Sequence, residues 1–316
     1  MSFSQRIVKM TGLSEVTQRL ALGVFLVCCF IHTAQQASHR PHIIIIVADD
    51  LGWSDVGFRD GEMHTPNIDK LASEGVSLNY SYMQQVCTPS RAAFLTGVYP
   101  FRMGLQYSVF TALKNNSMPM DKKVLPEHLQ SLGYKTHMVG KWHLDFCNYD
   151  MTPTHRGFDT FYGMYNGKAG YFNHTGNWNG YDLHEHTGPN PDTDWRVDWE
   201  GNGTYSTHLF TEKALQVLQS HDQSEPLFLF LSYQAVHSPL EAPEQYMDMC
   251  SKVTTGSKRK MHCAVTAAMD EGMGKVLKSA DSLGYSENLI TLFLSDNGGP
   301  VNLGKVEMIS MHSVFD

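Results

Sequence analysis

The sequence lacks several features that would place a protein in a common functional class. Its 24 Lys and Arg residues are outnumbered by 32 Asp and Glu residues, and the formal charge of -8 argues against a general nucleic-acid binder. The 16 histidines show no zinc-finger spacing. Internal repeats and low-complexity linkers are absent as well. What remains is a 316-residue chain with 42% hydrophobic residues, which is enough to bury a sizeable core and is typical of a globular α/β protein.

The apolar run near the N-terminus is also too short for a transmembrane helix. It covers residues 20–31, about 12 residues, whereas a membrane-spanning helix needs roughly 20. Basic residues precede the run and small residues follow it around Ala34 and Ala37, which is the order found in secretory signal peptides. We therefore predict a signal peptide over residues 1–37 and no stable membrane insertion. A signal anchor is the alternative.

Four N-glycosylation sequons fit passage through the secretory pathway. They begin at Asn79, Asn115, Asn173 and Asn202. Whether the protein then resides in the lysosome or outside the cell is left open.

Cysteines are few, and two of the six lie in the predicted signal peptide. The other four are Cys87, Cys147, Cys250 and Cys263. In an oxidising compartment Cys250 and Cys263 can form a disulfide, and the alternative is a pair of buried thiols.

Apolar runs alternate with amphipathic segments along the chain. The expected strands are residues 42–47, 134–139, 227–233 and 288–294, and the expected helices are residues 66–74, 126–132, 207–220 and 264–283. Thr65 offers an N-cap to the first helix, and Gly75 can end it. Strands separated by helices imply right-handed crossovers and a parallel sheet, whose ligand sites lie outside the carboxyl ends of the strands. Residues 150–203 show no clear periodicity and are expected to form long loops.

Polar side chains follow two of the expected strands. Asp49 and Asp50 come directly after the first strand, where two adjacent carboxylates repel each other unless a cation or hydrogen-bond donors compensate them. Asp296 and Asn297 occupy the matching place after the last strand. Together these oxygen ligands suit Ca²⁺ or Mg²⁺. The alternative is that Asp49 or Asp50 merely caps a turn.

Cys87 begins a segment that is typical of a short helix ending near Gly97. An anion bound beside Cys87 would face the N-terminus of that helix. For an isolated cysteine, a buried structural role is the competing interpretation.

The residues around Cys87 resemble the signature of a known family. The run Cys87-Thr88-Pro89-Ser90-Arg91 is similar to the sulfatase sequence Cys-x-Pro-x-Arg, in which the cysteine is oxidised to formylglycine. Four further motifs follow the order of the same family, at residues 48–52, 140–144, 236–239 and 295–299. The resemblance covers roughly residues 40 to 300 and is strongest to type I sulfatases close to arylsulfatases B, I and J.

This resemblance implies a fold and a reaction. The fold would be an alkaline-phosphatase-like α/β sandwich with a mostly parallel central sheet flanked by helices. The activity would be hydrolysis of a sulfate ester, either an aryl sulfate or a glycosaminoglycan sugar such as N-acetylgalactosamine 4-sulfate. The formylglycine-generating enzyme would convert Cys87 to 3-oxoalanine, whose hydrated form attacks sulfur and later expels sulfate as the aldehyde re-forms.

The resemblance also implies a role for each candidate residue. One Ca²⁺ would be held by Asp49, Asp50, Asp296 and Asn297 together with modified residue 87. Arg91 would steady the hydrated aldehyde, and Lys141 would neutralise sulfate charge. His143 would accept the proton that releases sulfate, and His237 would protonate the leaving oxygen or bind the ester. Taken singly, each of the two histidines fits a hydrogen-bonded core or loop role better, and the two basic residues could be solvated surface charges; the order of the motifs favours the site roles. We interpret the basic run of residues 258–260 as a solvated loop.

Three departures from the family pattern leave other interpretations open. Family members usually continue further, so residues 38–316 are expected to be an incomplete N-terminal catalytic domain without the small C-terminal domain. Lys305 is a poor candidate for a second sulfate-binding lysine, and Cys147 lacks the partner that close relatives carry between residues 107 and 121. The alternatives are a truncated, inactive sulfatase-like protein, or a phosphoesterase of the related fold, against which the intact Cys-x-Pro-x-Arg sequence argues.

Overall fold

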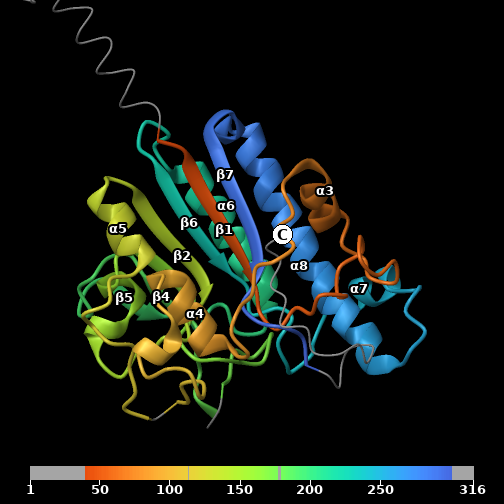
Figure 1. Cartoon of the computed structure of the whole chain (residues 1–316), viewed down its shortest axis with the longest axis horizontal. Coiled ribbons are helices and arrows are strands. Elements are labelled where there is room, and N and C mark those ends of the chain that lie inside the picture. The colour runs from red at the N-terminus through yellow and green to blue at the C-terminus, as the bar shows by residue number, and fades with distance from the viewer. Residues whose placement is uncertain (1–39, 113, 177–178, 301–316) are drawn as a thin grey trace, which may run out of the picture. The chain divides into compact units, whose positions relative to one another are not determined.

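The computed structural model describes residues 40–112, 114–176 and 179–300 (Figure 1). The predicted signal peptide and Lys305 lie outside the described residues. Within the described ranges, no helix is long and apolar enough to cross a membrane.

A seven-stranded sheet organises the chain, with the strand order β5-β4-β3-β2-β6-β1-β7. The strands are β1 (His42–Ala48), β2 (Lys135–Lys141), β3 (Thr160–Met164), β4 (His184–His186), β5 (Trp195–Val197), β6 (Leu227–Ser232) and β7 (Leu289–Ser295). In this order, the consecutive strands β3, β2, β6, β1 and β7 are parallel to one another. At the edge opposite β7, β4 pairs antiparallel with β3, and β5 pairs antiparallel with β4. The sheet is therefore mixed but mostly parallel, as predicted.

Helices cover both faces of this sheet (Figure 1). They are α3 (Pro66–Glu74), α4 (Cys87–Thr96), α5 (Leu125–Ser131), α6 (Ser206–Ser220), α7 (Glu244–Met249) and α8 (Ser257–Ser282). Short 3₁₀ helices are η2 (Pro100–Arg102), η3 (Tyr149–Met151), η4 (Pro153–His155) and η6 (Tyr285–Asn288). α6 and α8 pack on one face of the sheet, and α4 and α5 pack on the other.

Strand β1 shows why its sequence is apolar without interruption. Ile44 and Ile46 belong to the core between the sheet and the helices α6 and α8. Ile45 and Val47 point to the other face and pack in the core with α4 and α5. Because both faces of the strand are covered, all positions between His42 and Asp49 carry apolar side chains.

The four predicted strand-and-helix pairs are all present, but two sequence-based predictions are wrong. Residues 150–203 are not loops alone, because they contain β3, β4 and β5. β4 and β5 have three residues each, too few to show an alternating pattern. The run of residues 258–260 is not a solvated loop either. It lies in the first turn of α8, which begins seven residues earlier than predicted, and Arg259 is buried there.

The start of α3 is capped by a residue far away in the sequence. Thr65 precedes the helix as predicted, but its hydroxyl donates to Asp69 and does not cap the helix. The carboxylate of Asp270 on α8 instead accepts the backbone N–H groups of Asn67, at 3.1 Å, and Ile68, at 2.7 Å. The cap therefore also ties α3 to α8.

The cysteines outside the candidate site fall into two states. Cys250 and Cys263 form a disulfide between the end of α7 and helix α8, which decides between the two alternatives for this pair. Cys147 is a free, exposed thiol.

Candidate active site

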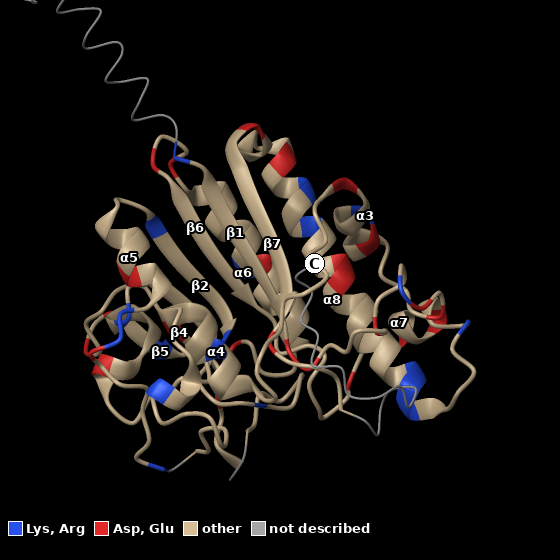
Figure 2. Ribbon diagram, in the orientation of Figure 1, with Lys and Arg blue, Asp and Glu red and all other residues tan. Residues whose placement is uncertain are grey.

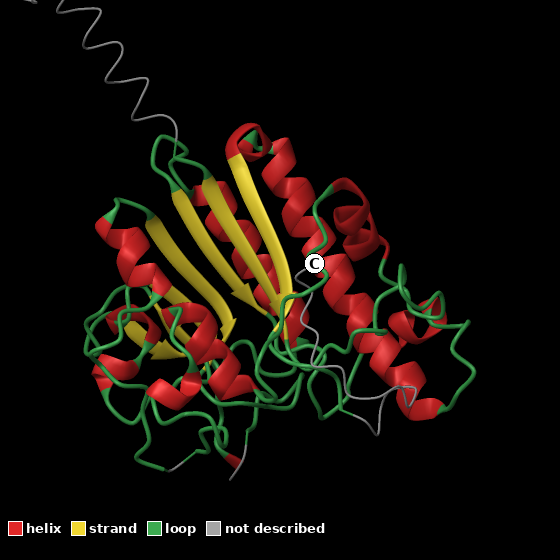
Figure 3. Cartoon of the chain, viewed as in Figure 1, coloured by secondary structure: helices red, strands yellow, loops and turns green. Residues whose placement is uncertain are grey.

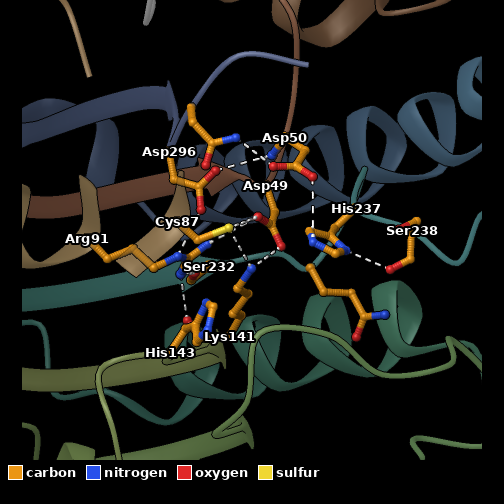
Figure 4. Close-up of polar contacts among 12 residues, drawn as sticks. Asp49, Asp50, Cys87, Arg91, Lys141, His143, Ser232, His237, Ser238 and Asp296 are labelled. Atoms are coloured by element: carbon orange, nitrogen blue, oxygen red, sulfur yellow. Dashed lines mark hydrogen bonds and ion pairs between the residues drawn. The ribbon is translucent and has the colours of Figure 1, made fainter. Parts of the chain in front are cut away.

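The carboxyl ends of four neighbouring strands bring the predicted site residues together (Figure 4). Asp49 follows β1, Lys141 ends β2, Ser232 ends β6 and Asp296 follows β7. Helix α4 contributes Cys87 at its first residue and Arg91 one turn later. Figure 3 shows that the loops of the site gather at this end of the strands, and Figure 2 shows acidic residues in them.

Three carboxylates and the Cys87 thiol form a compact cluster. One ligand atom from each of Asp49, Asp50, Asp296 and Cys87 lies within 4.8 Å of the others. The cluster is almost entirely buried, since only Asp50 is partly exposed. Without a cation such a concentration of negative charge is costly.

Asn297 completes an oxygen-rich site beside these carboxylates. Its Nδ2 donates to Oδ1 of Asp50 at 2.5 Å, and the backbone N–H of Asp50 donates to Oδ1 of Asp296 at 3.1 Å. The buried Oδ1 of Asn297 has no hydrogen-bond partner among the described residues. A carboxylate set with an unpartnered amide oxygen suits a hard divalent cation such as Ca²⁺ or Mg²⁺. The residues predicted as metal ligands therefore fit that role.

Two buried cations lie on the other side of the cluster. Nζ of Lys141 lies 2.5 Å from Oδ2 of Asp49 and 3.3 Å from Sγ of Cys87. Nε of Arg91 donates to Oδ2 of Asp296 at 2.9 Å, and its Nη1 donates to Oγ of Ser232 at 2.7 Å. Neither cation is a surface charge, because both side chains are at most 3% exposed.

Burial and charge set the protonation of these groups. Burial, reinforced by Asp296, raises the pKa of Asp49 well above its usual value. Burial alone would also raise the pKa of Asp296, but Arg91 and Lys141 outweigh it and lower that pKa. Burial raises the pKa of the Cys87 thiol well above its usual value, despite the nearby ammonium of Lys141. An unmodified Cys87 is therefore a thiol at neutral pH, which is a weak nucleophile.

His143 is held in one tautomer by the backbone. Its Nε2 lies 2.9 Å from the carbonyl oxygen of Phe110, which can only accept, so Nε2 carries the proton. Its Nδ1 is buried and has no partner among the described residues. Burial and the charge of Lys141 lower the pKa of His143 well below its usual value, which keeps Nδ1 unprotonated. His143 thus presents a bare proton acceptor.

His237 is hydrogen-bonded to the backbone through its other ring nitrogen, Nδ1, whereas His143 uses Nε2. Its Nδ1 lies 2.6 Å from the carbonyl oxygen of Ser238 and must carry a proton, while Nε2 lies 3.6 Å from Oδ2 of Asp50. Burial and the charge of Lys141 lower the pKa of His237. The structure places both predicted histidines at the site, on different sides of it (Figure 4).

Two contributing residues did not stand out in the sequence. Ser232 accepts a hydrogen bond from Arg91. Its position directly after five apolar strand residues is the sequence feature that could have identified it as a site residue. Thr88 connects two segments of the site, because its hydroxyl donates to the carbonyl of His143 and accepts the N–H of Phe110. The sequence pattern identifies the neighbouring Cys87 as a candidate site residue, but no sequence feature predicts this role for Thr88.

A cavity of about 420 Å³ opens beside His143. Its lining residues are Phe110, Thr111, Lys114, Asn115, His143, Asp145, Phe146, Cys147, Tyr165 and Asn166. The volume is within the range of small-molecule sites.

Comparison with known proteins decides what this arrangement belongs to. The family model described as Sulfatase matches residues 41–308. The chain belongs to the sulfatase family. This sulfatase chain is 43% identical over 269 residues to arylsulfatase J of Mus musculus, covering 84% of this chain and 44% of that protein. It is 30% identical to N-acetylgalactosamine-6-sulfatase of Mus musculus, covering 84% and 52%. The sulfatase chain thus spans about half the length of these curated relatives.

Solved structures agree on the fold of the sulfatase chain. The crystal structure of Ps i-CgsB superimposes with a TM-score of 0.75 and 32% identity, covering 85% of this chain and 61% of that chain. A protein of the alkaline phosphatase superfamily from Vibrio parahaemolyticus gives a TM-score of 0.56 at 19% identity. The predicted alkaline-phosphatase-like α/β fold is confirmed.

Proposed function

We propose that this sulfatase chain hydrolyses sulfate esters with residue 87 as a formylglycine nucleophile and one Ca²⁺ as cofactor. The observation that carries the proposal is the position of Cys87, at the N-terminus of α4 and 3.3 Å from Nζ of Lys141. The high pKa of the buried thiol makes plain cysteine a poor nucleophile, whereas formylglycine supplies a hydrated aldehyde that attacks sulfur. The formylglycine-generating enzyme would be the maturation partner.

Asp49, Asp50, Asp296 and Asn297 would hold the calcium ion together with residue 87. Bound there, the ion would offset the repulsion among the carboxylates and polarise the oxygens of the sulfate. The unpartnered Oδ1 of Asn297 and the close carboxylates support this assignment.

The chain's own side chains would then bind the anion and move protons. Lys141 would neutralise charge on the sulfate, and Arg91 would orient residue 87 from the same helix. Nδ1 of His143 would accept the proton from residue 87 when sulfate leaves, because Nε2–H stays hydrogen-bonded to Phe110. Only as an imidazolium, protonated at both ring nitrogens, would His237 deliver a proton from Nε2 to the leaving oxygen or hydrogen-bond the ester, while its Nδ1–H stays with Ser238.

The cavity beside His143 is where we place the alcohol part of the ester. Its wall combines Phe146 and Tyr165, which stack at 5.2 Å between ring centroids, with the amides of Asn115 and Asn166. Aromatic rings and amides together suit the ring and the polar substituents of a sulfated sugar. We therefore favour a glycosaminoglycan sugar such as N-acetylgalactosamine 4-sulfate, with aryl sulfates as model substrates.

We further propose a secretory protein that ends in the lysosome or outside the cell. The asparagines of all four sequons are exposed, and Asn79, Asn173 and Asn202, which do not line the cavity, can carry a glycan. The disulfide between Cys250 and Cys263 also fits an oxidising compartment. Residues 38–316 would form the N-terminal part of the catalytic domain.

The test is an assay of the purified chain after co-expression with the formylglycine-generating enzyme. An aryl sulfate and the matching aryl phosphate are compared, with Cys87→Ala as the control. Turnover of the sulfate by the wild type and not by Cys87→Ala is the expected result. Turnover of phosphate alone would identify a phosphoesterase. A chain that carries the aldehyde but cleaves neither ester would be an inactive sulfatase-like protein.

A further inference from the structure

A buried acid lies behind the loop that carries the metal ligands. Asp55 is 5% exposed and comes five residues after Asp50. Its Oδ2 accepts the backbone N–H of Gly52 at 2.9 Å, and its own N–H donates to the carbonyl of Gly52 at 3.0 Å. These two bonds close a tight turn directly after Asp49 and Asp50, so the side chain of Asp55 fixes the path of that loop.

The same carboxylate lies against the second metal loop. A Cβ atom on Gly299 would lie 3.0 Å from Oδ2 of Asp55 and 3.1 Å from Cα of Gly52. A Cβ atom on Gly52 would lie 2.6 Å from the same oxygen. The loops that follow β1 and β7 therefore meet at Asp55, with no room for a side chain between them.

Helix α8 supplies the countercharge for Asp55. Nη1 of Arg259 pairs with Oδ1 of Asp55, and Nη2 lies 3.4 Å from the carbonyl of Ser54. Nε2 of His262, one turn further along α8, lies 3.6 Å from Oδ2 of Asp55. Arg259 and His262 are at most 5% exposed. A buried carboxylate needs such a partner, because burial without one is costly.

We propose that Asp55 and Arg259 are positioning residues of the calcium site. Their ion pair anchors the loop of Asp49 and Asp50 to α8 and holds it against the loop of Asp296. The converging oxygens are then preorganised for the ion, and the pair itself touches neither metal nor substrate. This role rests on the proposed function, because it presumes that the site binds calcium.

Calcium affinity is the property that this pair should control. Residues that orient metal ligands typically change metal affinity by 10–100-fold when they are substituted. We therefore expect Arg259→Gln and Asp55→Asn to weaken calcium binding at least about tenfold. Arg259→Lys, which keeps the charge but loses the planar fork, should fall between these variants and the wild type. Lys258→Gln is the matched control, because Lys258 is the exposed neighbour of Arg259 on the same helix.

The experiment is isothermal titration of calcium chloride into each purified protein after co-expression with the formylglycine-generating enzyme. Aryl-sulfate turnover is measured in parallel at rising calcium concentrations. The expected result is a raised Kd in Arg259→Gln and Asp55→Asn, an unchanged Kd in Lys258→Gln, and recovery of kcat at saturating calcium. Recovery separates a positioning role from simple damage to the catalytic groups.

Two outcomes separate the proposals from each other. If the wild type binds calcium and folded Arg259→Gln and Asp55→Asn bind it equally well, the positioning role is overturned and the calcium site stands. If the wild type itself does not bind calcium, the metal part of the proposed function fails and the positioning role fails with it. If Arg259→Gln and Asp55→Asn do not fold, the calcium Kd of Arg259→Lys is compared with that of Lys258→Gln. A higher Kd in Arg259→Lys supports the positioning role, and an equal Kd overturns it.

Discussion

Nζ of Lys141 lies 2.5 Å from Oδ2 of Asp49, and neither side chain is exposed to solvent. The same nitrogen lies 3.3 Å from Sγ of Cys87. Asp49 and Cys87 thus share one cation between a strand end and the start of a helix. This ammonium both balances the carboxylates and lies where a sulfate on residue 87 would need positive charge.

Lys141→Met should therefore cost stability as well as activity. Removing one member of a buried ion pair typically costs about 3–5 kcal/mol, because the partner is left uncompensated. Urea unfolding in the presence of EDTA measures this cost without help from a metal. Lys135→Met on the same strand is the control, since Lys135 and Glu225 are about half exposed and such pairs contribute less than about 1 kcal/mol. Equal losses in the two variants would contradict the proposed role of Lys141.

His143→Gln should remove activity while leaving the fold intact. Without the bare Nδ1 no proton acceptor remains at this position, and loss of general-base catalysis lowers kcat by about 10²–10⁴-fold. The measurement is kcat on an aryl sulfate, beside circular dichroism. His128→Gln, at an exposed position on α5, should keep wild-type kcat. Wild-type kcat in His143→Gln would exclude this histidine as the base.

Part of this site could be predicted from the sequence, because several of its residues directly follow apolar strands, whereas Cys87 and Arg91 lie on helix α4. Asp49 after β1 and Asp296 after β7 were recognisable as strand-end carboxylates from local pattern alone. That β1 and β7 are neighbours in the sheet was not recognisable, since the order of parallel strands is set by long crossovers that leave no local signal. The family resemblance supplied the grouping that the local pattern lacked.

Residues that act through tertiary contacts could not be predicted, because contacts between distant segments leave no local signal in the sequence. Arg259 lies in a basic run that is typical of a solvated surface, and only its pairing with Asp55 reveals a buried role. Asp270 caps α3 across about two hundred residues, where Thr65 seemed the local candidate. The short strand β4 pairs with β3, and β5 pairs with β4, and both owe their conformation to this pairing and not to their own periodicity.

Acid should weaken the fold through His137 on β2. Burial, together with His221 and Lys135, lowers the pKa of this histidine from 6.5 to about 4, against the opposing charge of Asp159. Between these values the unfolded chain binds more protons than the folded one, so stability falls as the pH decreases from 6.5 to 4. A shift of this size corresponds to about 3 kcal/mol, fully present above pH 6.5.

Urea unfolding of the wild type and His137→Gln at several pH values between 7 and 4 checks this expectation. The variant should lose less stability on acidification than the wild type, because glutamine does not titrate. His128→Gln serves again as the exposed control and should follow the wild type. Identical pH dependence of all three proteins would show that His137 does not contribute.

Loss of the disulfide should lower stability without touching the candidate active site. Cys250 and Cys263 close a loop of 13 residues, for which the loss of chain entropy predicts about 3 kcal/mol. The double variant Cys250→Ser with Cys263→Ser should therefore unfold at lower denaturant concentration. Cys147→Ser, at the free and exposed cysteine, should unfold like the wild type. A double variant as stable as the wild type would contradict the expectation.

The central claim is that residue 87 becomes the nucleophile of a sulfatase, and mass spectrometry of one peptide tests it most directly. Trypsin releases residues 71–91 after Lys70 and Arg91, and any glycan at Asn79 is removed enzymatically beforehand. After co-expression with the formylglycine-generating enzyme, we predict a peptide in which the sulfur of Cys87 has been lost and an aldehyde oxygen gained. A peptide that retains the unmodified Cys87 thiol in full would contradict the account.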